Sequence, residues 1–269
     1  MDIYAAILDA HAAGRPAALC TVIRARGSAP RHASSKMLVY ADGQILGTVG
    51  GGEMERRVIV AARQALDDGQ PRVEHYELID VKQGDPGVCG GEVDIYIEPM
   101  KPDPVVLVIG GGHVGRAIVY LAKWLGFRVT LSDDRPEYCT PESAPGADEY
   151  LPMPISELAH RFRFHAETYV VMPTRGMPID VEGLPHLLDQ PFAYLGVIGS
   201  RRRWATAIKA LVEHGVPEAK LRRIHSPMGL ELNAETPEEI ALSIMAEIVM
   251  LRRGGTGETM KQLEMKNEE

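Results

Sequence analysis

The chain has 269 residues, enough for one large core or two modest ones, and its 45% hydrophobic and 25% charged residues exclude a disordered or fibrous protein. Its formal net charge of −8 argues against general binding to the phosphate backbone of nucleic acids, which depends on clustered lysine and arginine. The sequence has no apolar run of about 18 residues and only three widely spaced cysteines, so we expect reduced thiols, no membrane span and a cytoplasmic location.

The first predicted element is a short amphipathic helix, because Ile3, Ile7 and Ala10 repeat with helical spacing. The same stretch has neither a basic start nor an uninterrupted apolar core. We therefore do not expect it to be a secretory signal peptide.

Short strands around one helix are predicted for residues 1–100, which we interpret as an α+β domain. Residues 36–40 and 44–48 flank a short Gly-containing connection, which is a typical hairpin signal. Apolar and polar residues alternate over residues 93–98, as in a strand that is buried on one face.

A glycine-rich turn, GTVGGG at residues 47–52, leads into a predicted helix over residues 53–68. Successive glycines before a helix expose N–H groups to an anion, and the helix dipole adds positive potential. The turn could equally be a plain strand-to-helix connection. We favour a phosphate site, with the following candidate residues: Gly50, Gly51, Gly52 and Glu53.

Two further segments of this half carry candidate residues. The sequence GSAPR at residues 27–31 could present the Ser28 hydroxyl and the Arg31 guanidinium to a phosphate or a pterin edge, although it also reads as an ordinary turn. Cys89 is flanked by glycines that leave it accessible to a large ligand, although a lone cysteine is more often inert. No spacing typical of a metal site occurs.

A proline-rich linker near residues 100–104 separates this half from a second predicted domain at residues 104–253, and residues 254–269 are expected to form a flexible tail. A β-branched run at residues 105–109, a glycine turn, a helix to residue 125 and a strand at residues 128–131 form a βαβ unit with a buried parallel strand. The fold class is therefore α/β, with a Rossmann-like second domain.

The glycine turn of this unit, GGGHVG at residues 110–115, matches the dinucleotide-binding fingerprint, in which Gly110 permits a tight turn, Gly112 lets a pyrophosphate approach and Gly115 lets helix and strand pack closely. Asp133 follows about 20 residues later, where an acid meets a ribose hydroxyl, and the neighbouring Asp134 is its rival. Packing alone could also explain the glycines. We favour a bound dinucleotide-like ligand.

The rest of this domain contains two short apolar runs, at residues 169–172 and 194–198, which we interpret as strands. A helix over about residues 202–213 follows the second run. A long helix over residues 237–253 has a strong start signal, because Thr236 can cap it and a proline occupies its first position.

Between the strand at residues 194–198 and the next helix lies the sequence GSRRR. Its cations and N–H groups come at the carboxyl edge of the predicted sheet, which favours an anion site over a merely solvated charged face. The candidate residues are Gly199, Ser200 and Arg201.

Several segments occur together in a specific order: GSAPR, GTVGGGEME, VCGGEVDIYIEP, VLVIGGGHVGRAI, VTLSDDRPE, YLGVIGSRRR and SPMGLELNAETPEEIALSIMAEI. In this order they resemble the XdhC/CoxI family of xanthine dehydrogenase accessory proteins. The resemblance covers nearly the whole chain and rests mainly on the first segment, the GSRRR motif and the last segment.

The resemblance implies a chaperone and not an enzyme: a homodimer that binds finished molybdenum cofactor, in its molybdopterin or cytosine dinucleotide form, and shields it. Such a protein holds the cofactor while a cysteine desulfurase replaces an oxo ligand by sulfide, and then passes it to a xanthine dehydrogenase-type molybdenum hydroxylase. The cofactor contacts carried over by resemblance are Ser28, Arg31, Gly50, Gly51, Gly52 and Cys89.

One position departs from the family pattern. Where relatives have His after Thr-Arg-Gly, this chain has Met177, while Thr174, Arg175 and Asp180 still match. The departure puts a ligand contact or the sulfuration step in question.

Two alternatives remain open from the sequence. One is an oxidoreductase that uses NAD(P) at the GGGHVG turn, and the other is a nucleotide-sensing regulatory module. An enzyme would turn over a nicotinamide, a sensor would only bind it, and a chaperone would bind pterin and its partner.

Overall fold

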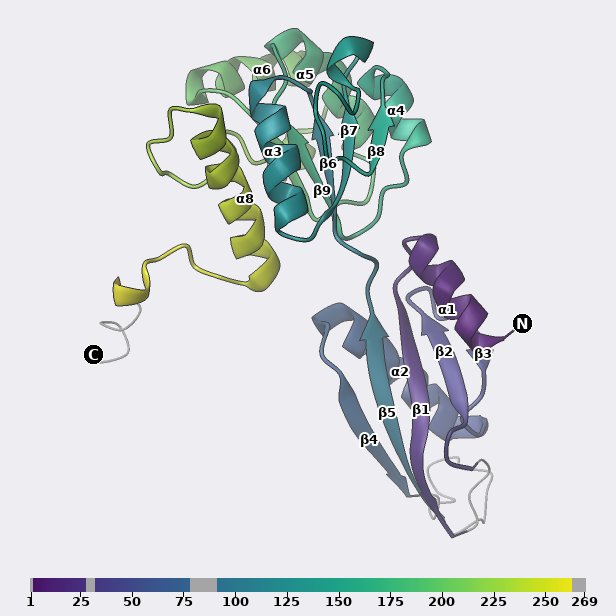
Figure 1. Cartoon of the computed structure of the whole chain (residues 1–269). Helices are drawn as coiled ribbons and strands as arrows, with labels where there is room; N and C mark the ends of the chain where they lie inside the picture. Colours follow the sequence, from purple (N-terminus) through teal and green to yellow (C-terminus); the bar gives the residue numbers. More distant parts are fainter. Residues whose placement is uncertain (1, 28–31, 78–90, 263–269) are drawn as a thin grey trace. The chain divides into compact units, whose positions relative to one another are not determined.

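The computed structural model describes residues 2–27, 32–77 and 91–262. The chain divides into two compact units, Met1–Asp103 and Pro104–Glu269, each with its own sheet (Figure 1). The first sheet is antiparallel and the second is parallel, which confirms the predicted fold class.

The N-terminal unit contains a five-stranded antiparallel sheet in the order β3-β2-β1-β5-β4. Its strands are β1 (Ala17–Arg26), β2 (Lys36–Tyr40), β3 (Ile45–Gly47), β4 (Arg72–Glu77) and β5 (Glu92–Met100). The predicted hairpin is present, because β2 pairs with β3 and Tyr40 N donates a hydrogen bond to Gln44 O.

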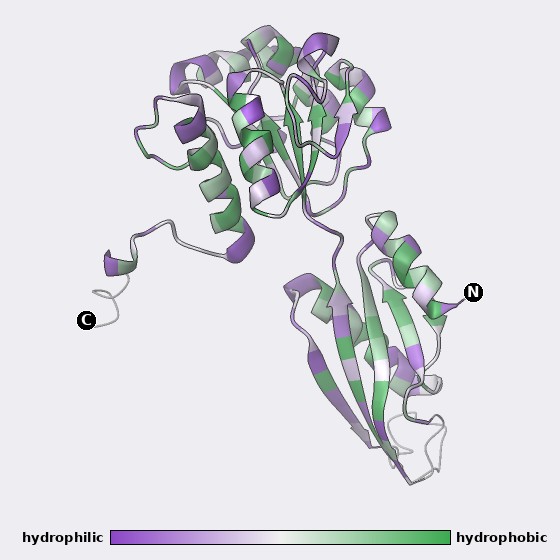
Figure 2. Cartoon of the chain, viewed as in Figure 1, coloured by the Kyte–Doolittle hydropathy of each residue, from purple (hydrophilic) through white to green (hydrophobic). Residues whose placement is uncertain are grey.

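Two helices cover opposite faces of this sheet. Helix α2 (Gly52–Asp68) packs on a cluster that includes Cys20 and Val22, whereas α1 (Ile3–Ala12) packs on a cluster that includes Ala17. Strand side chains alternate between the two faces, so a strand with apolar residues at successive positions can serve both clusters. Figure 2 shows the resulting runs of hydrophobic residues along the central strands.

The C-terminal unit contains a five-stranded parallel sheet in the order β10-β9-β6-β7-β8. Its strands are β6 (Val105–Ile109), β7 (Arg128–Ser132), β8 (Glu149–Leu151), β9 (Thr168–Met172) and β10 (Tyr194–Val197). The chain starts in the middle at β6, runs outward to β8, and then resumes at β9 on the other side. Ligands of such sheets bind where the strand order reverses, beyond the carboxyl ends of the strands.

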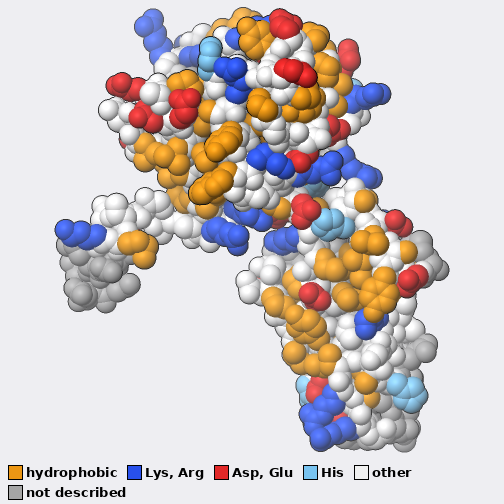
Figure 3. All heavy atoms as spheres, in the orientation of Figure 1, with side chains coloured by type: hydrophobic (Ala, Val, Ile, Leu, Met, Phe, Trp, Pro, Cys, Tyr) orange, Lys and Arg blue, Asp and Glu red, His pale blue; other side chains and the backbone are white. Residues whose placement is uncertain are grey.

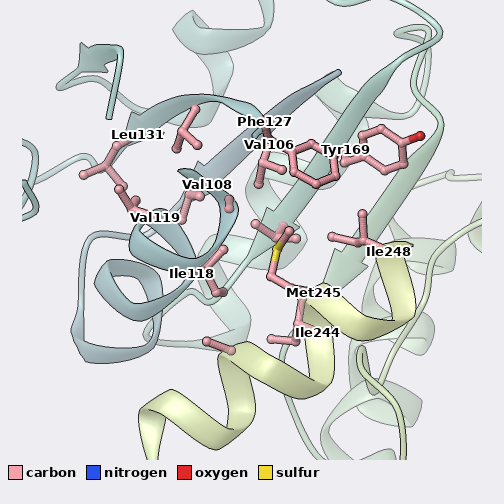
Figure 4. Close-up of a cluster of buried hydrophobic side chains, with 14 of the residues drawn as sticks. Val106, Val108, Ile118, Val119, Phe127, Leu131, Tyr169, Ile244, Met245 and Ile248 are labelled. Atoms are coloured by element: carbon pink, nitrogen blue, oxygen red, sulfur yellow. The ribbon is translucent and has the colours of Figure 1, made fainter. Parts of the chain in front are cut away.

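Helices cover both faces of the parallel sheet. Their bounds are α3 (His113–Trp124), α4 (Ile155–Arg161), α5 (Met177–Leu187), α6 (Arg201–Glu213), α7 (Glu218–Leu221) and α8 (Pro237–Arg253), with a 3-10 turn at Pro136–Tyr138. Helices α3 and α8 share one cluster, and α4, α5 and α6 share the other. Figure 4 shows Ile118 of α3 on the side of Ile244 and Met245 of α8, and Val119 near Val108 and Leu131.

Helix α8 begins and ends where the sequence predicts. Thr236 and Glu239 form a capping box at its start, and Gly254 ends it with a positive φ of 69°. Helix α5 was not predicted, because Pro178 and Pro185 hide its helical pattern.

A buried carboxylate ties α8 to the sheet and to the segment before the helix. Glu247 accepts hydrogen bonds from the Tyr194 hydroxyl at 2.6 Å and from Gly229 N at 2.7 Å, and its other oxygen lies 3.0 Å from His225 Nδ1. Burial opposes ionisation of Glu247, but these hydrogen bonds prevail and lower its pKa.

The outward side of α3 presents large apolar side chains. Tyr120 and Trp124 are 72% and 74% exposed, and Leu242 on the adjacent α8 is 52% exposed. Figure 3 shows hydrophobic side chains gathered over these two helices. Among the described helices, none is both long and apolar enough to cross a membrane.

Candidate functional site

A cavity of about 480 Å³ lies at the carboxyl edge of the parallel sheet. It is lined by the turn after β6, by the residues that follow β7 and β9, by the first turn of α4 and by the first two turns of α5. This is the place where the strand order reverses, and the volume is within the range of small-molecule sites.

The turn after β6 is closely packed on its inner side. A Cβ on Gly110 would lie 2.9 Å from Pro173 O, and one on Gly115 would lie 1.8 Å from Gly110 O. Both glycines are therefore required by the fold. Gly112 lies at the mouth of the turn, lines the cavity and directly precedes α3.

Asp133 follows β7 and is buried beside this turn. Its carboxylate accepts hydrogen bonds from Gly111 N at 2.8 Å, from Arg135 N at 3.0 Å, and from Arg135 Nε and Nη2, both at 3.0 Å. A carboxylate has about four acceptor positions. The residue predicted to bind a ribose is thus saturated by its own chain, and its role toward a ligand stays a prediction.

The neighbouring Asp134 points to a different partner. Its two oxygens accept hydrogen bonds from Arg175 Nη1 at 2.6 Å and Nη2 at 2.8 Å, in a two-point ion pair. The hydrogen bonds from Arg175 lower the pKa of Asp134 to about 2. Both side chains line the cavity and are only partly covered, being 38% and 45% exposed.

A buried carboxylate also lies behind the cavity, at the start of α5. Asp180 accepts hydrogen bonds from the Thr174 hydroxyl and, at 2.5 Å, from Arg203 Nη2 of α6. Burial raises the pKa of Asp180, against the effect of these two donors. This network joins the ends of β9 and α6.

The GSRRR motif contributes to that network through its last arginine. Ser200 caps α6 by accepting a hydrogen bond from Arg203 N at 3.2 Å, and Arg201 is exposed on the first turn. Within the described residues, the cavity lining stops at Ile198, so Gly199, Ser200 and Arg201 lie beside the cavity and not in it. Their predicted anion site stays a prediction.

The GTVGGG turn of the N-terminal unit is closed by a carboxylate of its own helix. Glu55 Oε2 accepts hydrogen bonds from the Thr48 hydroxyl at 2.5 Å, from Val49 N at 3.2 Å and from Gly51 N at 3.1 Å. Gly50 N donates to Thr48 Oγ1 at 3.1 Å. Glu55 therefore occupies the position at which we expected a phosphate.

The remaining candidates of this turn lie at the helix start. Gly52 is the first residue of α2, and Glu53 pairs with Arg56 at 3.2 Å on a partly exposed surface. Displacement of Glu55 by a ligand would be needed for the predicted phosphate site, which stays a prediction.

Three candidates, Ser28, Arg31 and Cys89, lie outside the described residues, and their roles also stay predictions. The other two cysteines are buried. Burial raises the pKa of Cys20 to about 12 and also raises that of Cys139, so both thiols are protonated at neutral pH. In the described part of the chain, no group of three His, Cys, Asp or Glu side chains could hold a metal ion.

The structure shows relations that the sequence did not reveal. The Asp134–Arg175 ion pair and the closure of the first turn by Glu55 both depend on side-chain geometry. Two features of the sequence could have indicated these contacts: Arg175 comes soon after a buried strand, and Glu55 lies one turn into a helix. Met177, in place of the expected His, is the first residue of α5 and is half-buried.

Comparison with known proteins defines the class of protein. The XdhC Rossmann domain family matches residues 106–248, and the XdhC and CoxI family matches residues 10–77. The chain belongs to the XdhC and CoxI family.

Individual relatives agree with this assignment. The chain is 36% identical to the uncharacterized protein YqeB of Escherichia coli over 97% of its own length, and 31% identical to a probable xanthine dehydrogenase subunit from Bacillus subtilis over 60%. It spans about half of these relatives, 48% and 46% of their lengths. It is 23% identical to the molybdenum cofactor insertion chaperone PaoD of Escherichia coli, covering 91% of this chain and 86% of PaoD.

A solved structure shows the same fold over both units. The crystal structure of a xanthine dehydrogenase from Bacillus halodurans is 21% identical and aligns with a TM-score of 0.51, covering 96% of this chain and 97% of that one.

Proposed function

We propose that this protein is a chaperone for molybdenum cofactor that serves a xanthine dehydrogenase-type molybdenum hydroxylase. It binds the finished cofactor, protects it, holds it while a cysteine desulfurase partner adds the sulfide ligand, and delivers it to the apo-enzyme. In this role it acts as an accessory protein in the cytoplasm, as a homodimer. The observation that carries the proposal is membership of the XdhC and CoxI family together with a match to PaoD over most of both chains.

The geometry of the C-terminal unit supports a cargo-binding role. The cofactor carries phosphate, and the start of α3 at the cavity offers the first N–H groups of the helix and positive dipole potential for it. Arg175 supplies a cation at the same cavity, and its exposure leaves it accessible to a ligand. An open cavity of this size suits a ligand that must be taken up and released.

The test is native mass spectrometry of the full chain, purified without oxygen from a host that makes molybdenum cofactor. A bound mass of the pterin cofactor is expected, and the protein should raise the activity of a cofactor-free hydroxylase when cofactor is supplied. A protein that carries no pterin and leaves the hydroxylase inactive would overturn the proposal.

The predicted contacts of the N-terminal unit can be tested in the same assays. Arg31→Ala should weaken pterin binding about tenfold, as expected for loss of one charge-assisted hydrogen bond. Arg63→Ala, which removes an exposed arginine on α2, is the control. Cys89→Ala should retain pterin but deliver less active enzyme; full delivery would leave that thiol without a role in sulfur handling.

An oxidoreductase that uses NAD(P) is the second candidate. It is favoured by one observation, the position of the GGGHVG turn at the cavity beside the acidic end of β7. Anaerobic incubation with NADH or NADPH and candidate acceptors would show turnover at 340 nm in that case. Nicotinamide binding without turnover would instead indicate a sensor.

A further inference from the structure

Helix α3 carries an outward stripe of large side chains. Arg116, Tyr120 and Trp124 recur at four-residue intervals, so they lie on one side of the helix, opposite the buried Ile118 and Ala122. Tyr120 and Trp124 are 72% and 74% exposed. A single exposed aromatic side chain is ordinary, but a continuous exposed apolar surface marks an interaction site.

A hollow of about 680 Å³ lies beside the first part of this stripe. Its walls come from α3, from the start of α8 and from residues 142–145, and they include the apolar side chains of Ala117, Leu121 and Leu242. Arg116 also lines the hollow. Its guanidinium donates one long hydrogen bond, 3.4 Å, to Ser143 O, and it forms no ion pair within the described part of the chain.

The projecting indole and the hollow lie at different ends of the stripe. Arg116 and Trp124 are eight residues apart, which is about 12 Å along the helix, so Trp124 does not reach the Arg116 end of its own copy. A two-fold axis beside Tyr120 removes this separation, because residues 116 and 124 each lie about 6 Å from Tyr120 along α3. In a two-fold contact, residue i meets residue j and residue j meets residue i. The stripe is therefore complementary to itself.

The chemistry of the groups that meet across such an axis is favourable. Arg116 is a cation, and Trp124 has the ring that attracts cations most strongly. Two antiparallel copies of α3 also bring the positive end of one helix dipole beside the negative end of the other. Lys123 adds no uncompensated charge, because its Nζ donates hydrogen bonds to Asp148 at 2.7 and 2.9 Å. A ridge of side chains at four-residue spacing is the surface that interdigitates in the commonest class of helix packing.

We propose that a second copy of this chain binds to the α3 stripe across a two-fold axis beside Tyr120. Trp124 of each copy enters the hollow of the other and covers Arg116 there, and the two Tyr120 rings meet at the axis. Leu242 of α8, which is 52% exposed, extends the apolar centre of the contact. The inference rests on the proposed function only in its homodimer, and it assigns the surface that forms it.

The first experiment is sedimentation equilibrium of the full chain from about 1 to 100 µM. The mass should double with a Kd of about micromolar, because a contact built on one helix and the edge of a second is small. Trp204→Phe leaves Trp124 as the only tryptophan, and its fluorescence should shift to shorter wavelength as the dimer forms. A monomer at all these concentrations, or a dimer in which Trp124 emission does not change, would overturn the inference.

Variants of Tyr120 test the symmetry of the contact. Tyr120→Glu and Tyr120→Lys each bring two like charges together at the axis, so each variant alone should have a Kd at least about tenfold higher. An equimolar mixture of the two variants should form a dimer again, because opposite charges then meet. Circular dichroism shows whether both variants are folded. A mixture that stays monomeric while both variants are folded would rule out the two-fold arrangement.

Further variants locate the hollow and its occupant. Trp124→Ala should raise the Kd about 30-fold, as expected for a central aromatic side chain, and Arg116→Ala about fivefold. Tyr4→Glu is the matched control, because Tyr4 is a 58% exposed tyrosine on α1. Unchanged dimerisation in both Tyr120→Glu and Trp124→Ala, or an equal loss in Tyr4→Glu, would overturn the assignment of the surface.

The same preparations separate this inference from the role in cofactor handling. If the wild-type protein forms a dimer through α3 but carries no pterin and leaves the hydroxylase inactive, the cofactor role fails and the contact stands. If a monomeric protein carries and delivers pterin, the contact fails and the cofactor role stands.

Discussion

Two glycine-rich turns in this chain precede helices, and their surroundings differ. In the N-terminal unit, Glu55 of α2 reaches back and accepts the N–H groups of Val49 and Gly51. In the C-terminal unit, Asp133 accepts only the N–H of Gly111 in its turn, and Gly112 faces a cavity. One turn is closed by an internal anion and the other is open. A run of glycines before a helix therefore indicates a helix start, whereas the nearest carboxylate decides which N–H groups of the turn are already bound.

The largest expected effect is on the free energy of unfolding. It distinguishes a glycine of the open turn that the packing requires from one that the packing does not require. Gly115→Ala should lower the free energy of unfolding by about 3 kcal/mol, because the added Cβ would lie 1.8 Å from Gly110 O. Gly112→Ala should cost less than about 1 kcal/mol, because it replaces only a glycine N-cap of α3 and adds no clash. Both tryptophans, Trp124 and Trp204, lie in the C-terminal unit, so urea unfolding followed by their fluorescence measures this unit alone. Similar losses in the two variants would contradict the distinction.

The next effect comes from opening the closed turn. Glu55→Ala should cost about 2 kcal/mol, because two backbone N–H groups and the Thr48 hydroxyl lose their acceptor. The variant should also gain a response to anions: sulfate should raise its melting temperature more than chloride of equal ionic strength does. Glu53→Ala, which removes only a partly exposed ion pair with Arg56, is the control. The absence of any extra sulfate effect would show that closure by Glu55 is not what excludes an anion.

A smaller effect is expected at Glu247, another internal carboxylate that accepts a glycine N–H. Glu247→Gln should cost about 1 kcal/mol at neutral pH. Because the pKa of Glu247 is lowered in the folded protein, its contribution is complete above the unfolded pKa and is lost as the pH falls through the folded value. The difference between wild type and variant should therefore shrink below about pH 4.5. Urea midpoints measured from pH 7 to pH 3 check this, and a difference that stayed constant would argue against it.

The smallest effect belongs to Thr48, which donates to Glu55 and accepts from Gly50 N. Thr48→Val keeps the shape of the side chain and should cost about 0.5 to 1 kcal/mol, while Glu55 still holds the two N–H groups. Unlike Glu55→Ala, it should gain no sulfate response. Circular dichroism melts of the two variants in parallel would show whether the carboxylate or the hydroxyl closes the turn.

Much of the fold follows from the sequence, because its signals are local. The helix predicted over residues 53–68 is present at Gly52–Asp68, and α8 has its predicted bounds, since caps and glycine stops act within one turn. Helices α4 and α7 were not predicted, and neither was α5. Its first turn and interior contain prolines, and it forms because Leu184 and Leu187 are buried in the cluster beneath the sheet.

The site was only partly predictable, because its polar groups find partners far away in the sequence. The turn and its acidic partner follow from the spacing of Gly110 and Asp133. The partners of the two aspartates are Arg135 and Arg175, and Arg175 lies 41 residues from Asp134. The hydrophobic periodicity of a sequence does not indicate a pairing between two polar side chains so far apart in the chain.

The packing of α8 on α3 also has a consequence for the order of events during synthesis. The apolar face of α3 is covered by Ile244, Met245 and Ile248, which leave the ribosome more than a hundred residues after the glycine turn does. Until then the apolar face of α3 lacks its cover, so the C-terminal unit can complete its packing only after α8 has been synthesised.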